Sequence, residues 1–405
     1  MTDAPGGPSG RDWFAHSATV PPDAAAAVGE ALDRYVADVE RHVGEAGLTG
    51  VNLHLSGSLA RQEPAVRRIG AVHGPPAGHG GPTGHVSPTG HGVTGAGGWT
   101  YTLASDVDLV AVTAEPGPGG GLPALGALSS VLAGLSPGFE TSVLPVRGSR
   151  LPYVRSAFGH DLWTGYGAPV ARTFPAPPFP EPVSGDCAAT ELVTHQLAAA
   201  LGESEPAAFD LAELSPSRAG KLCLEGLRAA AAAGGLPARR FSDLYRHRDD
   251  TLWRGFTTPQ VIDDLVRRRE LSLHARPFPC DVLALLTACL GLVLAGSADT
   301  GADALAAGPL TAAADAPDLA TSFPAVTALI ALLPRLSGPH RRRCAATLVR
   351  ATDPSGRTTA RPAAIAEGDG TARKELWTAW QRLRARYTAH VESLHHGEPA
   401  TAPRT

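Results

Sequence analysis

A Pro-rich stretch at 173–182 separates two halves of the chain that carry different patterns, and this change most constrains the fold. Before the stretch, apolar and polar residues alternate as in β-strands, with helical segments between them. After it, apolar residues recur only at three- and four-residue steps, which is typical of helices. The sequence therefore predicts an α+β protein with a small mixed-sheet domain, the Pro-rich linker and an all-helical domain. The predicted ranges are a flexible N-terminus at 1–21, the mixed-sheet domain at 22–172, the linker at 173–182, the helical domain at 183–396 and a flexible tail at 397–405.

Within the first domain, a helix is expected at 23–46, where Val28, Leu32, Tyr35 and Val39 repeat at helical spacing. The remaining expected elements follow from alternation and from Gly and Pro positions. They are strands at 51–55, 106–112 and 140–146, and helices from 57 through 68, at 122–135 and at 151–163.

Residues 70–98 consist mainly of Gly, Pro, His, Thr and Ser and contain the near-repeats GPTGH and SPTGHG. Such a composition cannot build a core, so we expect a flexible insertion in the mixed-sheet domain. His79, His85 and His91 recur every six residues, but no cysteine or acid accompanies them. A low-complexity loop is the favoured interpretation over a zinc site.

Charge and apolar patterning limit the location and partners of the protein. The formal net charge is −4, so no global basic field would hold a nucleic-acid backbone, and a nucleic-acid partner is not expected. The five cysteines form no CxxC pair, which favours reduced thiols. The start of the chain has no signal-peptide pattern. The longest apolar run, 282–295, is too short to span a bilayer. These features predict a soluble cytoplasmic protein without a membrane partner.

Asp106 and Asp108 are the first candidates for chemistry. Side chains alternate along a strand, so residues two apart share a face while Val107 and Leu109 point to the other. Two adjacent carboxylates repel each other unless a cation lies between them, and carboxylate oxygens are the ligands that Mg²⁺ prefers. A pair of solvated acids at a strand end is the alternative interpretation.

Gly57 and Ser58 form the second candidate element, because they follow a predicted strand and open a short helix. Glycine permits a bend that brings backbone amides toward a phosphate, and the serine hydroxyl offers another donor. An isolated Gly-Ser turn is common. Its value here lies in the order of strand, Gly-Ser turn, short helix and a later strand that begins Ser-Asp-Val-Asp-Leu.

The segments LSGSLARQEP and SDVDLVAV together resemble the signature of the polymerase-β-type nucleotidyltransferase superfamily, in particular the kanamycin and streptomycin adenylyltransferases and the minimal nucleotidyltransferases. The resemblance implies Mg²⁺-dependent transfer of a nucleoside monophosphate from an NTP, with ATP expected, to an acceptor hydroxyl of a small molecule or a protein. It implies that Gly57 and Ser58 hold the triphosphate and that Asp106 and Asp108 bind the metal.

Two features depart from that family pattern. Family members place the carboxylates much closer to the Gly-Ser turn, whereas 48 positions separate Ser58 from Asp106. The excess coincides with the Gly/Pro/His insertion, and a surface loop adds little closure entropy as it lengthens. The family also has a third carboxylate on a neighbouring strand. Glu140 is the candidate for this catalytic and metal-binding position, and Ser142, two residues later on the same face, is the alternative occupant.

Three further candidates have weaker support. Lys221, on a predicted helix of the second domain, could contact the triphosphate, as helical-domain cations do in related enzymes, or be part of a solvated face. His160-Asp161 could suggest a base or a segment that connects the domains. The runs 267–269 and 341–343 of three arginines each are expected to be solvated helix ends. If the third carboxylate is missing, the alternative function is a catalytically silent nucleotide-binding or interaction module of the same fold.

Overall fold

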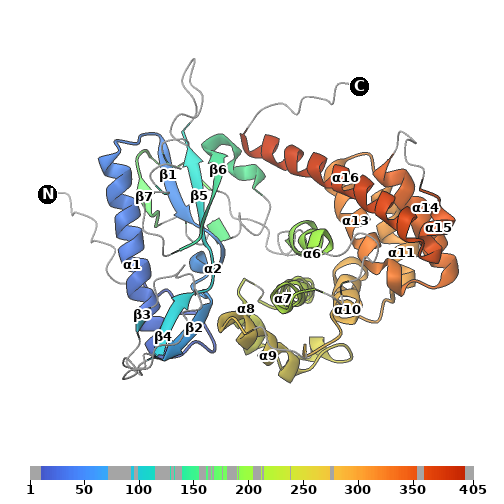
Figure 1. Cartoon of the computed structure of the whole chain (residues 1–405), viewed down its shortest axis with the longest axis horizontal. Helices are drawn as coiled ribbons and strands as arrows, with labels where there is room; N and C mark the ends of the chain where they lie inside the picture. The colour runs from blue at the N-terminus through green and yellow to red at the C-terminus, as the bar shows by residue number, and fades with distance from the viewer. Residues whose placement is uncertain are drawn as a thin grey trace, which may run out of the picture. The chain divides into compact units, whose positions relative to one another are not determined.

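The protein is a mixed α+β molecule whose chain divides into two compact units, described from a computed structural model (Figure 1). The first unit comprises Met1–Pro152, Phe158–Glu181 and Glu270–Leu273, and the second comprises Tyr153–Ala157, Pro182–Arg269 and His274–Thr405. The structure describes residues 11–71, 93–94, 99–114, 128, 132, 139–154, 161–162, 166, 168–175, 177–179, 189, 191–203, 211, 214–237, 239–273, 278–353 and 360–396.

The first unit is built on a four-stranded mixed sheet in the order β6-β5-β1-β7. Its strands are β1 (Val51–Leu55), β5 (Val107–Thr113), β6 (Thr141–Arg147) and β7 (Ala171–Arg172). β1 runs antiparallel to both β5 and β7, whereas β5 and β6 are parallel. The three longer strands lie within one residue of the predicted ranges.

Helix α1 (Pro22–Glu45) packs on one face of this sheet, as its apolar spacing predicts (Figure 1). Val28, Leu32 and Val39 are buried in one cluster with alternate residues of β1 and β5. The strand residues in that cluster are Val51, Leu53, Leu55, Val107, Leu109 and Ala111. Because side chains alternate along a strand, Asn52, His54 and Asp108 belong to the opposite face.

A second, three-stranded sheet in the order β2-β4-β3 corrects two predictions. Its strands are β2 (Val66–Ala71), β4 (Trp99–Leu103) and β3 (Val93–Thr94). The predicted helix from 57 through 68 is wrong beyond its first turn, because Gln62 adopts a left-handed φ of 60° and Pro64 follows it. Strand residues also lie within both ends of the predicted loop at 70–98, whereas 72–92 and 95–98, with the three histidines, are outside the described residues.

Two other segments of the first unit differ from expectation, and a third agrees where it is described. Within the predicted loose terminus, Trp13 is buried and its indole N–H donates to Asp33 Oδ1 at 2.8 Å. The helix expected at 151–163 begins instead as the 3₁₀ helix η1 (Gly148–Tyr153). Of the helix expected at 122–135, only Leu128 and Leu132 are described, and both are helical.

The predicted linker is bound to the first sheet where it is described. Asn52, fully buried in β1, accepts hydrogen bonds through Oδ1 from the backbone N–H groups of Thr173, at 2.9 Å, and Phe174, at 3.2 Å. The Asn52 amide donates to the Phe174 carbonyl at 3.1 Å. One side chain thus satisfies three backbone groups and holds residues 173–174 beside β1.

Every element described in the second unit is helical, as predicted. The elements are η2 (Glu191–Leu197, a π-helix), α6 (Ala198–Glu203), α7 (Pro216–Ala233), α8 (Phe241–Arg246), η4 (Thr251–Trp253), α9 (Pro259–Glu270), α10 (Val282–Ala295), α11 (Ala302–Ala307), α12 (Pro309–Ala314), α13 (Leu319–Leu332), η5 (Leu333–Arg335), α14 (Gly338–Thr352), α15 (Pro362–Glu367) and α16 (Gly370–His396).

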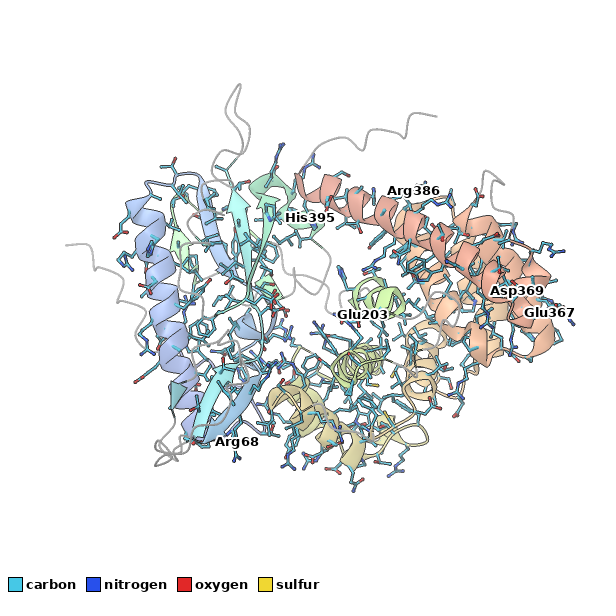
Figure 2. All side chains as sticks on the ribbon, in the orientation of Figure 1. Arg68, Glu203, Glu367, Asp369, Arg386 and His395 are labelled. Atoms are coloured by element: carbon cyan, nitrogen blue, oxygen red, sulfur yellow. The ribbon has the colours of Figure 1, made fainter. Side chains whose placement is uncertain are left out.

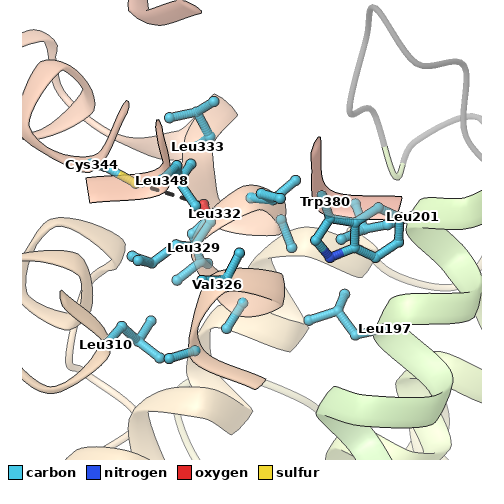
Figure 3. Packing of buried hydrophobic residues seen from close by; sticks show 14 of the residues in the cluster. Leu197, Leu201, Leu310, Val326, Leu329, Leu332, Leu333, Cys344, Leu348 and Trp380 are labelled. Carbon is cyan, nitrogen blue, oxygen red and sulfur yellow. Dashed lines mark hydrogen bonds between the residues drawn. The ribbon is translucent and has the colours of Figure 1, made fainter. Parts of the chain in front are cut away.

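The core of the second unit forms around α13, most of whose side chains are buried (Figure 3). Trp380 of α16 is fully buried there, and its indole N–H donates to Thr327 Oγ1 at 3.2 Å. Apolar burial drives this packing, and the one polar group of the indole keeps a partner. Within the described part of the chain, no helix is long and apolar enough to cross a membrane.

Candidate functional site

The turn after β1 brings Gly57 against Asp108. The backbone N–H of Ser56 donates to the Asp108 carbonyl at 2.8 Å, which continues the pairing of β1 with β5. Gly57 then adopts a φ of +59°, a conformation that side chains rarely tolerate. A Cβ built on Gly57 would lie 2.3 Å from Asp108 Oδ2, so a larger residue at position 57 would force this carboxylate to move. The two motifs singled out in the sequence therefore meet in space.

Asp108 is the second residue of β5 and is half-buried in a strand whose other residues are buried. The parallel pairing of β5 with β6 places Ser142 directly opposite Asp108. The Ser142 hydroxyl donates to Asp108 Oδ1 at 2.7 Å. Of the candidates Glu140 and Ser142, the serine is thus the one shown to bond the carboxylate.

Asp106 and Glu140 lie at the neighbouring strand ends. β5 begins at Val107 and β6 at Thr141, so each acid immediately precedes its strand, and both side chains are exposed. The Val107 N–H donates to the Glu140 carbonyl at 2.7 Å, which brings these two chain segments together. Across the residues that the structure describes, no three Asp, Glu, His or Cys side chains gather into a group that could hold a metal ion. Asp106, Asp108 and Glu140 therefore do not form a ready three-ligand set.

Ser58 lies in α2 (Gly57–Ala60), a single helical turn. Its side chain is 6% exposed, so little of it is open to a ligand. A helix this short carries only a small part of the dipole that longer helices present to phosphate. The chemistry of this turn therefore depends on the bend at Gly57 and the adjoining backbone more than on a helix terminus.

A buried ion-pair network follows the turn, and we did not single out its arginine from the sequence. Arg61 donates through Nε to Glu63 Oε1 at 2.7 Å and through Nη1 to Asp161 Oδ2 at 2.5 Å. All three residues are less than 10% exposed. The ion pair therefore holds Asp161 beside the turn that begins at Gly57, whereas His160 is outside the described residues.

The sheet face that carries Asp108 also carries an aromatic stack. His54 of β1 lies opposite Val110 of β5, two residues from Asp108. The His54 ring stacks on Tyr166 with centroids 4.4 Å apart. Tyr166 donates its hydroxyl to the Pro177 carbonyl at 2.6 Å, and burial raises the pKa of Tyr166 to about 12. The phenol therefore stays protonated and serves as a fixed donor.

The basic residues singled out in the second unit differ in their exposure and in their ion-pair and hydrogen-bond partners. Lys221 is exposed on α7, and its contact with a triphosphate stays a prediction. Arg218, one turn earlier, pairs with Glu203, the last residue of α6 and labelled in Figure 2. In the two arginine runs, Arg268 pairs with Asp264 at 2.6 Å, and Arg341 donates to the Leu336 carbonyl. These arginines stabilise their own helices and turns.

The carboxylates near Gly57 are of the chemical type that binds a divalent cation. Two carboxylates two residues apart supply the oxygen ligands that Mg²⁺ prefers, and Mg²⁺ commonly keeps water or phosphate in its other positions. Asp108 Oδ2 lies directly against the turn at Gly57. Asp106 and Asp108 are the residues that would hold the ion, and the serine at position 142 contributes no charge.

Comparisons with protein-family models, with curated proteins and with solved structures find no match to this chain.

Proposed function

We propose that the first unit is a Mg²⁺-dependent nucleotidyltransferase that moves a nucleoside monophosphate from an NTP to an acceptor hydroxyl. The observation that carries the proposal is the contact of the positive-φ turn at Gly57 with the Asp108 carboxylate. The order β6-β5-β1, with β5 antiparallel to β1 and parallel to β6, supports the finer arrangement of a nucleotidyltransferase domain.

Each residue has a defined task in this proposal. Asp106 and Asp108 hold Mg²⁺, which when bound neutralises charge on the phosphates of the NTP. Gly57 lets the backbone of the turn lie close to Asp108, and the backbone amides of the turn orient the phosphate. Ser142 holds Asp108 Oδ1, which leaves Oδ2 directed toward the turn.

The acceptor is proposed to be a small molecule or a protein side chain, and ATP the nucleotide. The net charge of −4 argues against a polynucleotide acceptor, because phosphate binding by proteins depends on clustered positive charge. Glu140, exposed beside the start of β5, stays a prediction for the base that takes the acceptor proton, and Lys221 for a triphosphate contact.

Binding is tested first, with the full chain and ATP in the presence and absence of Mg²⁺. We expect the melting temperature to rise only when both are present, and the rise to vanish in an Asp106→Asn, Asp108→Asn double variant. Asp249→Asn, an exposed acid of the second unit, is the control and should keep the rise. A shift that survives the double variant would contradict the proposed site.

Chemistry is tested separately by exchange of labelled pyrophosphate into ATP, with candidate acceptor hydroxyls supplied. We expect exchange that requires Mg²⁺ and both aspartates. Binding without exchange for any acceptor would support the second candidate, a catalytically silent nucleotide-binding module. The observation that favours this alternative is the neutral Ser142 hydroxyl on Asp108, where a third carboxylate would otherwise complete the metal site.

A further inference from the structure

Three free thiols come together in the second unit, outside the proposed nucleotide site. Cys223 lies on α7, Cys289 lies on α10, and Cys280 precedes α10. Cys223 and Cys289 are buried members of one apolar cluster, and Cys280 packs against the same cluster. Fifty-seven positions separate Cys223 from Cys280 in the sequence, so the helical packing alone brings them together.

Cys223 and Cys280 are hydrogen-bonded to each other through their side chains. Cys223 is 3% exposed, whereas Cys280 is partly exposed. A small oxidant in water therefore reaches the sulfur of Cys280 first. The Cys223 thiol is buried and lies within hydrogen-bonding range of the Cys280 sulfur.

The surroundings of the two sulfurs also differ in charge. Burial and the neighbouring Asp281 carboxylate raise the pKa of Cys280, but the hydrogen bond with Cys223 outweighs them. The hydrogen bond from Cys223 lowers the pKa of Cys280 and raises that of Cys223. Cys280 is thus the nucleophile of the pair, and Cys223 is the proton-bearing partner.

We propose that Cys280 and Cys223 form a peroxide-sensitive dithiol that closes to an intramolecular disulfide between the start of α10 and the middle of α7. The Cys280 thiolate attacks one oxygen of hydrogen peroxide and the O–O bond breaks. Cys280 becomes a sulfenic acid, and the leaving hydroxide takes a proton to form water. The sulfur of Cys223 then attacks the sulfenic sulfur, the S–O bond breaks, and the hydroxide leaves as water with the Cys223 proton.

The balance of this step is complete. Two thiols and one peroxide give one disulfide and two waters, and the two sulfurs lose the two electrons that the peroxide oxygens gain. Closing the bond requires the sulfurs to approach from hydrogen-bonding range to about 2.05 Å. Reduction by an added dithiol reverses the reaction.

Two other cysteines of the second unit serve as matched controls. Cys289 is fully buried and burial raises its pKa strongly. Cys344 is buried on α14, with its sulfur 3.9 Å from the Leu329 carbonyl, and burial raises its pKa to about 12 (Figure 3). Neither thiol is expected to react with peroxide while the protein is folded.

The experiment exposes the folded full chain to a small excess of hydrogen peroxide, then blocks the remaining thiols and maps the peptides by mass spectrometry. We expect a Cys223–Cys280 disulfide, a monomer two mass units lighter, and oxidation of Cys280 at least tenfold faster than of Cys344. Cys223→Ser should trap the sulfenic acid at Cys280, where dimedone labels it. Cys280→Ser should abolish both products, whereas Cys289→Ser and Cys344→Ser should leave the disulfide intact.

Several outcomes would overturn the proposal. They are oxidation of Cys280 to sulfinic acid without a cross-link in the wild-type protein, a disulfide from Cys280 to Cys187 or to another chain, or a reaction no faster than that of Cys344. Peptide mapping of the wild-type chain decides among these without any substitution. The test therefore holds even if a buried Cys223→Ser variant fails to fold.

Discussion

Asp108 and Gly57 approach each other so closely that a methyl group on the glycine would lie 2.3 Å from the carboxylate oxygen Oδ2. The approach is possible because the β1–β5 ladder continues through Ser56, whose N–H bonds the Asp108 carbonyl. Gly57 and Asp108 are thus in contact although they lie more than fifty positions apart in the chain. The proposed site depends on this contact.

Gly57→Ala should destabilise the first unit and remove Mg²⁺-ATP binding. The left-handed backbone costs an alanine about 1–2 kcal/mol, and the clash with Asp108 adds about 1–3 kcal/mol as overpacking. Gly47→Ala is the control, because Gly47 has a φ of +61° and nothing within 4 Å of its missing Cβ. Urea unfolding of both variants separates the clash from the strain. Equal losses would show that Asp108 does not crowd Gly57.

Ser142 decides how much negative charge surrounds Asp108. Ser142→Ala removes the hydrogen bond to Oδ1, and we expect Mg²⁺-ATP affinity to fall severalfold with little change in melting temperature, because Ser142 is exposed.

Ser142→Asp should have the opposite effect on metal binding. The new carboxylate repels Asp108 without metal and offers a third oxygen ligand with it, so the melting temperature should fall in chelator and rise with Mg²⁺ or Mn²⁺. Differential scanning fluorimetry over a metal titration measures both. A response equal to that of wild type would place position 142 outside the metal site.

Arg61 should be far more important for stability than an exposed arginine with similar partners. Arg61→Met leaves Glu63 and Asp161 buried without its charge, which is expected to cost about 3–5 kcal/mol. Arg41 also has two acidic partners, Asp38 and Glu45, but its side chain is 53% exposed, so Arg41→Met should cost less than about 1 kcal/mol. Similar denaturation midpoints for the two variants would argue against this network.

Asn52→Ala should destabilise the attachment of residues 173–174 to the sheet. The change leaves two backbone N–H groups and one carbonyl without the Asn52 partner, and each buried unsatisfied group costs about 1–3 kcal/mol. Thr102→Val, which removes only a 3.4 Å contact to the Leu103 carbonyl, is the control. Hydrogen exchange of the Thr173 and Phe174 amides should quicken in Asn52→Ala alone.

Glu270 should make stability depend on pH. Its carboxylate accepts hydrogen bonds from the Ala18 and Thr19 N–H groups, but burial dominates and raises its pKa. The folded state therefore binds more protons than the unfolded state between the unfolded pKa of about 4.3 and the raised folded pKa. The contribution of Glu270 is complete below that interval and is lost as pH rises through it. Glu270→Gln should remove this loss, as measured by urea unfolding from about pH 4 to about pH 8, whereas Glu367→Gln, at an exposed position, should leave the loss unchanged.

Periodicity along the chain was enough to predict α1, β1, β5 and β6 to within one residue. These elements form where apolar residues two, three or four positions apart build one continuous face, and such a face is visible in a short window. β2 escaped this reasoning. Its polar Arg67 and Arg68 resemble a helix surface, and the segment is a strand because it pairs with β4, about thirty residues later in the chain.

The candidate site divides in the same way. Glycine after a strand and two aspartates at alternating positions are local signals. The sequence alone therefore identifies Gly57 and Asp108 as candidates, but not their contact. Sequence alternation does not decide which residue contacts Asp108, because Glu140 and Ser142 lie on the same face. The register of β6 against β5 places the serine opposite Asp108. Arg61 with Asp161, and Cys223 with Cys280, likewise depend on which segments pack together. Neighbouring residues determine short-range backbone preferences. The register of paired strands and the contacts between side chains tens of residues apart are determined only when the whole chain buries its apolar surface.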